Sequence, residues 1–287
     1  MNGWLVYDKT SALDNVAYIE WFIEEATKQS IQLELIYRES LHTGVVNGEH
    51  HILLHEEIVP LPDFAVIRTI EPVLQSFLEI CHIETFNSST ISTICNHKML
   101  THLELNKLNI PMVPTFFTSK NTLSKNPPLA YPLIIKEASG RSGKQVHLIK
   151  NDEDWRRAIP LLQTKDIIIQ SADVMLGKDL RVFVIGKEII AAVLRVNKND
   201  FRANYKLGGD AILYTLSDKE KKMIQQIIDH FDFGLVGIDF LIGKNGELLF
   251  NEIEDVVGSR ILSKVSDINL LEKYVTFIKN KISMKKI

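Results

Sequence analysis

Cysteine is scarce in this chain of 287 residues, which contains only Cys81 and Cys95. The two do not form a CxxC motif, and no nearby histidine pair has metal-ligand spacing, so neither a disulfide scaffold nor a zinc site is indicated. We expect both thiols to behave as small buried hydrophobic groups.

Positive charge is not in excess either. The chain has 33 Lys and Arg against 36 Asp and Glu, whereas proteins that bind phosphate backbones usually carry a basic surplus. No apolar run approaches the roughly 20 residues that a membrane helix needs. We therefore expect no nucleic-acid partner, no membrane partner and a cytoplasmic location, and leave open a homo-oligomer.

With 45% hydrophobic residues, the chain is long enough for two or three lobes with cores of their own. Its first 90 residues alternate short apolar runs with amphipathic stretches, which predicts a small open α/β domain. A long helix over residues 90–108, ended by Asn109, follows, and the polar segment 120–128 reads as a loop between lobes. The expected elements of the first part are strands at 3–7, 31–37 and 64–67, and helices at 16–27, capped by Asp14, and at 73–79.

Strands dominate the second half of the sequence. An Asn245-Gly246 turn between two apolar runs is a strong hairpin signal, and Ser217 with Glu220 has the pattern of a capping box. The overall class is α/β (α+β). The expected elements are strands at 131–137, 145–149 and 166–170, a helix at 152–162 capped by Asn151, and hairpins of 180–185 with 188–196, through Gly186-Lys187, and of 235–242 with 247–253.

A candidate phosphate site begins at Lys136, which ends an apolar strand and precedes a glycine- and serine-rich loop over residues 139–144. Backbone N–H groups of such a loop can approach a polyphosphate while the lysine neutralises its charge. The segment does not match the P-loop motif, because Gly143-Lys144 is followed by Gln145. A plain hairpin turn is the competing interpretation.

A candidate metal site lies on the last hairpin. Glu252 and Glu254 are two residues apart in a strand and project from one face, with Asn251 and Ile253 on the other, and adjacent pairing can bring Asp239 to the glutamates. Three converging carboxylates repel one another unless a cation neutralises them, and hard oxygen ligands favour Mg²⁺. A solvated acidic strand face is the competing interpretation.

The segment 200–210 mixes cations, an amide and paired glycines, which suits an anion-binding loop but also a solvated one. Arg181 and Arg195 stand in apolar strands, where an arginine usually needs an anionic partner. Because Asp179 is two positions from Arg181 on the same strand face, an ion pair between these two is the simplest expectation.

The order of these features resembles the RimK-like branch of the ATP-grasp superfamily over about residues 64–264. The resemblance rests on Lys98, on Lys136 with its glycine-rich loop, on the Asp179-Leu180-Arg181 step, on the loop with Phe201-Arg202-Ala203-Asn204 and Gly208-Gly209, and on Asp239 and Glu252. It implies an ATP-grasp fold with a pre-ATP-grasp domain over residues 1–90, a central or lid part over 91–170 and a C-terminal part over 171–287.

The resemblance also implies roles for individual residues. Lys98 and Lys136 resemble the two lysines that hold the nucleotide phosphates, and residues 168–172 resemble the hinge that meets adenine through backbone hydrogen bonds. The nucleotide-binding set is Lys98, Lys136, Ser139, Gly140, Ser142, Gly143, Gln170, Ser171, Ala172, Asp179 and Arg181. The catalytic set, facing the phosphoryl group and substrate, is Arg195, Arg202 and Asn204, and the metal set is Asp239, Glu252 and Glu254.

The sequence departs from the family pattern at two motifs. The usual metal motif Glu-x-Asn is Glu252-Ile253-Glu254 here, which adds a negative charge, and the hinge has Ser171-Ala172 in place of a glutamate and an aromatic residue. These departures bear on metal number and on adenine preference. His97 and His102 fall within the expected long helix and are interpreted as ordinary surface or interfacial residues.

The resemblance implies an ATP-dependent carboxylate–amine ligase that forms an acylphosphate, with ATP and Mg²⁺, or Mn²⁺ as the alternative ion, as cofactors. The expected partners are a carboxylate and an amine, with glutamate added to a peptide or protein as one option and a small metabolite as another. A non-catalytic ATP-binding regulator and a carboxylate kinase remain alternatives, because a fold does not fix a function.

Overall fold

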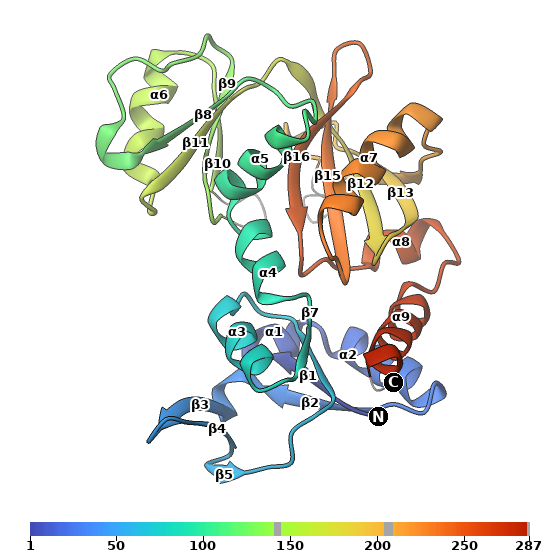
Figure 1. The fold of residues 1–287 in the computed structure, drawn as a ribbon. Coiled ribbons are helices and arrows are strands. Elements are labelled where there is room, and N and C mark those ends of the chain that lie inside the picture. Colours follow the sequence, from blue (N-terminus) through green and yellow to red (C-terminus); the bar gives the residue numbers. More distant parts are fainter. Residues whose placement is uncertain (141–144, 204–208, 286–287) are drawn as a thin grey trace.

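A computed structural model describes residues 1–140, 145–203 and 209–285 of the chain. Four sheets organise these residues. Figure 1 shows the two N-terminal sheets at the bottom, a green four-stranded sheet at the upper left and the longest strands, in yellow and orange, at the upper right.

The first sheet is parallel, with the strand order β2-β1-β6-β7. Its apolar strands are buried, as the sequence predicted, but Asp14 is not the predicted cap. Asp8 caps α1 by accepting a hydrogen bond from the N–H of Ser11 at 2.7 Å, and Asp14 ends that helix. The elements are β1 Asn2–Tyr7, α1 Lys9–Asp14, α2 Val16–Lys28, β2 Gln32–Tyr37, β6 Phe64–Ile67, α3 Pro72–Ile80 and β7 Glu84–Phe86.

A small antiparallel sheet, absent from the sequence prediction, is inserted between β2 and β6. It consists of β3 Leu41–Val46, β4 Glu49–Leu54 and β5 Glu57–Ile58, after the 3₁₀ turn Arg38–Ser40. Asn47 and Gly48 form its first turn with φ of 52° and 86°. An Asn-Gly pair is a hairpin signal, so this turn could have been predicted from the sequence.

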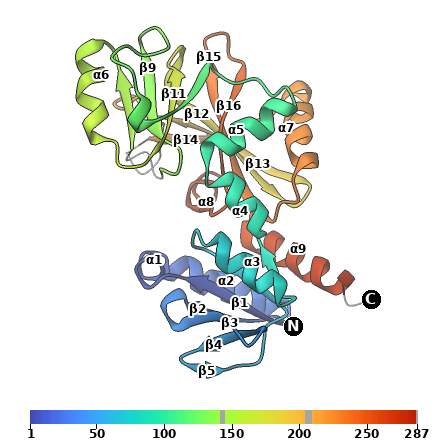
Figure 2. The ribbon, with the colours of Figure 1, turned by 60° about the vertical axis from the view of Figure 1, so that its left-hand side comes forward.

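The expected helix over residues 90–108 is two helices, α4 Ser89–Cys95 and α5 Lys98–Lys107. Asn96 donates its side-chain amide to the Ser92 carbonyl, and His97 adopts an extended backbone, which ends the first helix. The break places Lys98 at the first turn of α5. Figures 1 and 2 show both helices running from the N-terminal part towards the upper sheets, and residues of both pack in one apolar core with Phe250.

The third sheet has the order β10-β9-β11-β8, with β10 at one edge. Its core includes Leu133, Ile135 and Trp155, the last from α6. The polar segment 120–128 lies between β8 and β9, which belong to this same sheet. It is therefore not the expected loop between lobes. The elements are β8 Thr115–Ser119, β9 Leu133–Glu137, β10 Val146–Ile149, α6 Asp152–Ala158, β11 Asp166–Ser171 and the 3₁₀ turns Lys120–Thr122 and Ile159–Leu161.

The fourth sheet is antiparallel, with the order β14-β13-β12-β15-β16, and contains both predicted hairpins. The predicted capping box begins α7. The elements are β12 Val174–Ile185, β13 Glu188–Val196, β14 Asp210–Leu213, α7 Asp218–His230, β15 Leu235–Gly243, β16 Leu248–Glu254 and α8 Arg260–Val265.

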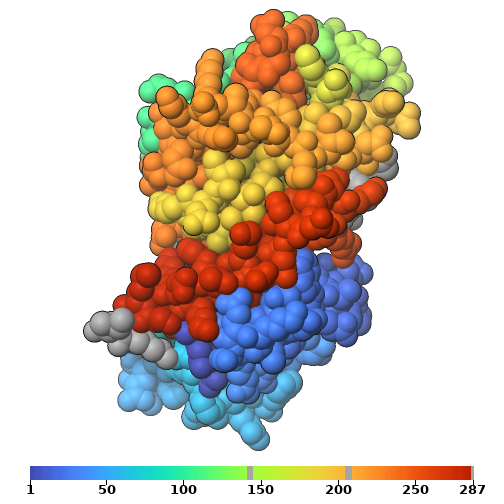
Figure 3. Space-filling view, turned by 90° about the vertical axis from the view of Figure 1, so that its right-hand side faces the viewer, coloured from blue at the N-terminus to red at the C-terminus, as the bar shows by residue number. Residues whose placement is uncertain are grey.

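The last helix, α9 Leu270–Lys285, packs against α2 of the first sheet. Figure 3 shows this red helix lying across the blue N-terminal residues, and Gln29 donates a hydrogen bond to the Glu272 carbonyl at 3.0 Å. The C-terminal end of the chain therefore helps to hold the N-terminal part in place. Within the described ranges, the chain forms no helix long and apolar enough to span a bilayer.

Candidate active site

Three carboxylates meet on the last two strands of the fourth sheet, as the sequence predicted. Asp239 of β15 lies opposite Glu252 of β16, and Glu254 lies two residues further along β16. One oxygen from each carboxylate lies within 4.8 Å of the others. This set of hard oxygen donors fits Mg²⁺, which would be held by these three residues.

A β-bulge changes which residues face the site. Asp239 pairs with Glu252, but the next residue, Phe240, pairs with Phe250, so Asn251 is an extra residue in β16. Strict alternation predicted that Asn251 points away from the glutamates, and this was wrong. Its side-chain oxygen accepts a hydrogen bond from the Lys136 ammonium at 3.0 Å, which makes Asn251 a site residue that the sequence did not reveal.

Two arginines hold the buried Asp239 from the side of β12 and β13. Arg181 donates to both of its oxygens at 2.7 and 2.6 Å, and Arg195 donates to one of them at 2.8 Å. Burial opposes ionisation of this carboxyl, but the two arginines outweigh burial and lower its pKa. The arginines therefore keep the Asp239 carboxylate ionised and fix its orientation.

The expected ion pair between Asp179 and Arg181 is absent. Asp179 accepts two hydrogen bonds from Arg195, at 2.5 and 2.7 Å, because the two residues lie opposite each other in the β12–β13 register. Arg181 lies opposite Asp239 instead, and also pairs with Glu254 at 2.9 Å. Arg195 is buried and committed to two carboxylates, so it orients Asp239 within this network.

The two predicted phosphate lysines approach the carboxylates from the opposite side. Lys98 at the start of α5 lies 3.2 Å from Glu252 and donates to the Gly140 carbonyl at 2.5 Å. Lys136 is buried, and burial lowers its pKa to about 8; Glu252 opposes this change and Lys98 adds to it. Burial also opposes ionisation of Glu252, but Lys98 and other groups lower the pKa of that carboxyl.

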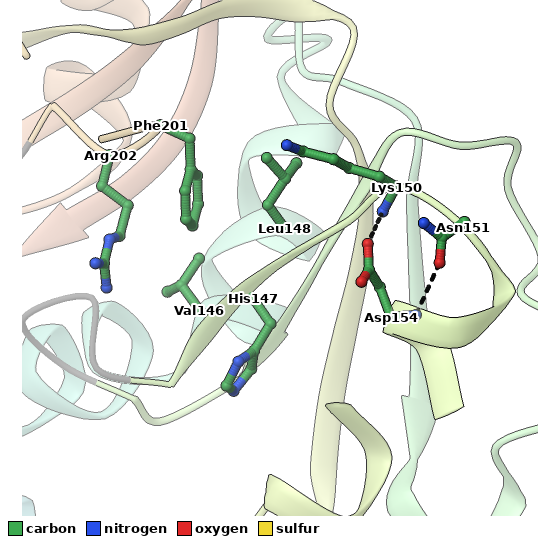
Figure 4. Close-up of a pocket in the computed structure, with 8 residues that line it drawn as sticks. All are labelled: Val146, His147, Leu148, Lys150, Asn151, Asp154, Phe201 and Arg202. Atoms are coloured by element: carbon green, nitrogen blue, oxygen red, sulfur yellow. Dashed lines mark hydrogen bonds between the residues drawn. The ribbon is translucent and has the colours of Figure 1, made fainter. Parts of the chain in front are cut away.

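The predicted loops contribute only in part to the described site. Gly140 contacts Lys98 through its carbonyl and Ser139 is exposed, whereas Ser142, Gly143 and Asn204 lie outside the described residues. Arg202 pairs with Asp200 at 2.8 Å, and its guanidinium lies over the Phe201 ring. Figure 4 shows Phe201 and Arg202 on one side of a cavity of about 670 Å³ and residues of the third sheet on the other.

Comparison with known proteins decides the family. The profile of the RimK-like ATP-grasp domain matches residues 95–278, which is more than half of the chain. The chain belongs to the RimK-like ATP-grasp family.

Two relatives of the chain in this family have assigned activities. N-Acetylaspartylglutamate synthase A of Mus musculus is 25% identical over 279 residues, which cover 89% of this chain and 72% of the mouse protein. The glutamate–LysW ligase ArgX of Sulfurisphaera tokodaii is 27% identical over 234 residues, covering 77% of this chain and 83% of that protein.

Solved structures share the ATP-grasp fold. A RimK domain ATP-grasp protein of Sphaerobacter thermophilus has a TM-score of 0.73 at 13% identity, with 96% of this chain and 99% of that chain covered. The ATP-grasp ligase PsnB, complexed with a phosphomimetic variant of a minimal precursor, Mg and ADP, has a TM-score of 0.72 at 12% identity, with 98% of each chain covered.

The predicted hinge, residues 168–172, uses part of its hydrogen-bonding capacity within the protein. The N–H groups of Ser171 and Ala172 donate to the carbonyls of Pro114 and Pro132, at 3.0 and 3.1 Å. The Gln170 side chain donates to Thr115 at 3.0 Å. The predicted adenine contact through backbone hydrogen bonds therefore cannot use these two N–H groups unless their bonds break.

Of the two interpretations of His102, surface or interfacial, burial excludes the first. It lies four residues after Lys98 in α5, and its Nδ1 is 2.7 Å from the Lys98 carbonyl, to which it donates. Nε2 must then accept from Gln170 at 3.0 Å, which fixes a neutral tautomer. Burial lowers the pKa of His102 to about 3, with a contribution from Lys136.

Proposed function

We propose that this chain is an ATP-dependent ligase that joins a carboxylate to an amine through an acylphosphate. One observation carries the proposal: three carboxylates lie within 4.8 Å of one another, with Lys98 and Lys136 on one side and Arg181 and Arg195 on the other. Such an arrangement suits a metal-bound polyphosphate, since phosphoryl transfer depends on positioning and charge neutralisation.

In the proposed reaction an oxygen of the substrate carboxylate attacks the γ-phosphorus of ATP, and the bond from that phosphorus to the β,γ-bridging oxygen breaks to release ADP. The amine nitrogen then attacks the carbonyl carbon of the acylphosphate, phosphate leaves, and the nitrogen loses a proton. Mg²⁺ at Asp239, Glu252 and Glu254 would neutralise phosphate charge during the transfer.

The protein's own groups perform defined parts of this chemistry. Lys98 and Lys136 would contact the phosphates, because their ammonium groups lie beside β16, Lys98 next to Glu252 and Lys136 next to Asn251. Arg181 and Arg195 keep Asp239 ionised and oriented. Arg202 and Asn204 are proposed to face the transferred phosphoryl group or the substrate.

The substrates are proposed from the relatives. N-Acetylaspartylglutamate synthase A and the glutamate–LysW ligase both carry glutamate in their names, and PsnB is complexed with a precursor. We infer that an amino acid, with glutamate as the first choice, enters as the amine. The carboxylate then belongs to a small acid or to a peptide.

ADP release tests the proposal. The purified chain is incubated with ATP and Mg²⁺ and with carboxylates and amines, added singly and in pairs. A ligase releases ADP rapidly only when both substrates are present. Release with a carboxylate alone would identify a carboxylate kinase, and binding of ATP without release under any pairing would favour a regulator.

A further inference from the structure

The free edge of the third sheet has the features of a peptide-docking strand. Among the residues that the structure describes, β10 pairs only with β9, and no described strand lies along its other side. The edge borders the cavity of about 670 Å³, which Phe201 and Arg202 of the connection between β13 and β14 line from the other side. The cavity is broadly open to solvent, so an extended segment could reach the edge from outside.

The register shows which backbone groups are available. Glu137 donates its N–H to the Gln145 carbonyl, so these residues form a hydrogen-bonded pair. Because bonded and non-bonded pairs alternate in an antiparallel ladder, Val146 and Leu148 turn their N–H and C=O groups away from β9. Within the described part of the chain, no hydrogen bond occupies these outward groups.

The next outward group marks the end of the available edge. The N–H of Lys150 donates to the Asp154 carboxylate at 2.9 Å, and Figure 4 shows this bond at the start of α6. An added strand can therefore pair along Val146 to Leu148 and must leave the sheet near Lys150. A segment paired with the four residues of β10 would span roughly 13 Å.

Side chains around the edge define what an occupant would present. In Figure 4, Val146 and Leu148 extend towards Phe201, whereas His147 is directed away from them. Lys150 is exposed, and although its N–H bonds Asp154, its ammonium forms no ion pair with any residue that the structure describes. An extended chain with apolar residues on one face and an acidic residue near Lys150 matches this surface.

We propose that the edge of β10 binds an extended peptide by adding it to the third sheet as a fifth strand. The inference rests on the proposed ligase function only in assigning that peptide to a substrate. Val146 pairs with Lys136, whose ammonium donates a hydrogen bond to Asn251 of β16. The Val146 end of the edge therefore lies nearer the proposed site of phosphoryl transfer. A peptide whose C-terminal carboxylate reacts would then run antiparallel to β10.

The test uses the full chain and one synthetic probe, a fluorescein-labelled Glu-Val-Glu-Val-Glu peptide, with binding followed by fluorescence anisotropy. Leu148→Pro removes an outward N–H without removing a bond to β9, and Leu148→Val is the matched control that keeps the N–H. Thermal unfolding confirms that both variants are folded. We expect Leu148→Pro to weaken binding roughly three- to tenfold and Leu148→Val to stay within about twofold of wild type.

Two further arms make the result decisive. A peptide N-methylated at its second valine, whose N–H would face β10, and a Lys-Val-Lys-Val-Lys peptide should both bind more weakly to wild type. Equal binding of the probe by wild type and Leu148→Pro, or no binding by wild type, would overturn the proposal. ADP release with free amino acids is measured in parallel, so that a failed ligase assay with intact peptide binding refutes the ligase function and not the docking site.

Discussion

The two sides of the carboxylate cluster are built differently. On the side of β12 and β13, Arg181 and Arg195 each donate to carboxylates in two-pronged pairs that are already complete. On the side of the third sheet, Lys136 has a neutral amide, Asn251, as its hydrogen-bond partner. Arginines paired in this way fix the orientation of the carboxylates, and in the proposed reaction the buried lysine would have its charge left for a phosphate.

The largest effect should come from breaking the arginine side. In Asp239→Asn the central negative charge is lost while Arg181 and Arg195 stay buried, and removing one partner of a buried ion pair costs about 3–5 kcal/mol. We expect that loss in the free energy of unfolding, measured with urea, together with complete loss of ADP release. A variant as stable as wild type would show that the arginine network does not depend on Asp239.

On the lysine side we expect a loss of ATP affinity without a loss of stability. Lys136→Met removes an ammonium whose pKa is already lowered to about 8 by burial, so the unfolding free energy should stay equal or rise. ATP affinity should fall by about 1.5–3 kcal/mol through the lost charge-assisted contact. Titration calorimetry checks the affinity, and an unchanged Kd for ATP would remove Lys136 from the nucleotide site.

His102 lies on the lysine side, between the Lys98 carbonyl and the Gln170 side chain, and should give a pH-dependent stability. Its pKa of about 3 in the folded chain lies below about 6.5 in the unfolded chain, so the unfolded state binds the extra proton between these values. The free energy of unfolding should therefore rise with pH over this window, by at most about 1.4 kcal/mol per pH unit, and level off above it.

The control for this effect is His102→Gln, which has no titratable ring. Urea unfolding of both proteins from pH 4.5 to 7.5 should show a steeper dependence for wild type. Parallel curves would mean that His102 does not contribute the slope.

The smallest effect is expected at Glu254, whose side chain is 37% exposed and shares Arg181 with Asp239. Glu254→Asn keeps an oxygen ligand and loses one charge, so turnover should persist but need more Mg²⁺. Glu254→Ala should be clearly less active. If Glu254→Ala matches wild type across a Mg²⁺ titration, Glu254 is not a ligand.

The sequence predicted the parts of the site that local patterns determine. The Asn245-Gly246 turn sets the hairpin that brings Asp239 to Glu252, and residue spacing places Glu254 on the same face. Lys136 was singled out by its strand-end position beside the glycine-rich loop and Lys98 by the family resemblance, and the structure brings both next to β16.

Long-range pairing accounts for what the sequence did not predict. Arg181 binds Asp239 because β12 lies between β13 and β15, and this neighbourhood is not encoded near Arg181. The bulge at Asn251 lies among contacts with distant segments, such as the Phe250 N–H bond to the Pro111 carbonyl. The helix break combines the local bond of Asn96 to Ser92 with a distant bond from the Lys98 N–H to the Ala138 carbonyl. His102 had a local signal, its spacing of four residues from Lys98 on a helix, but its partner Gln170 comes from another sheet.

Calorimetric titration of ATP, with Mg²⁺ and with EDTA, into wild type and Glu252→Gln tests the central claim most directly. We predict that Mg²⁺ tightens ATP binding to wild type and that Glu252→Gln loses most of this gain, because one carboxylate ligand is gone. Without Mg²⁺ the variant should bind ATP at least as tightly as wild type, since Lys98 is released from its partner. An equal gain from Mg²⁺ in both proteins would contradict a metal site at these carboxylates.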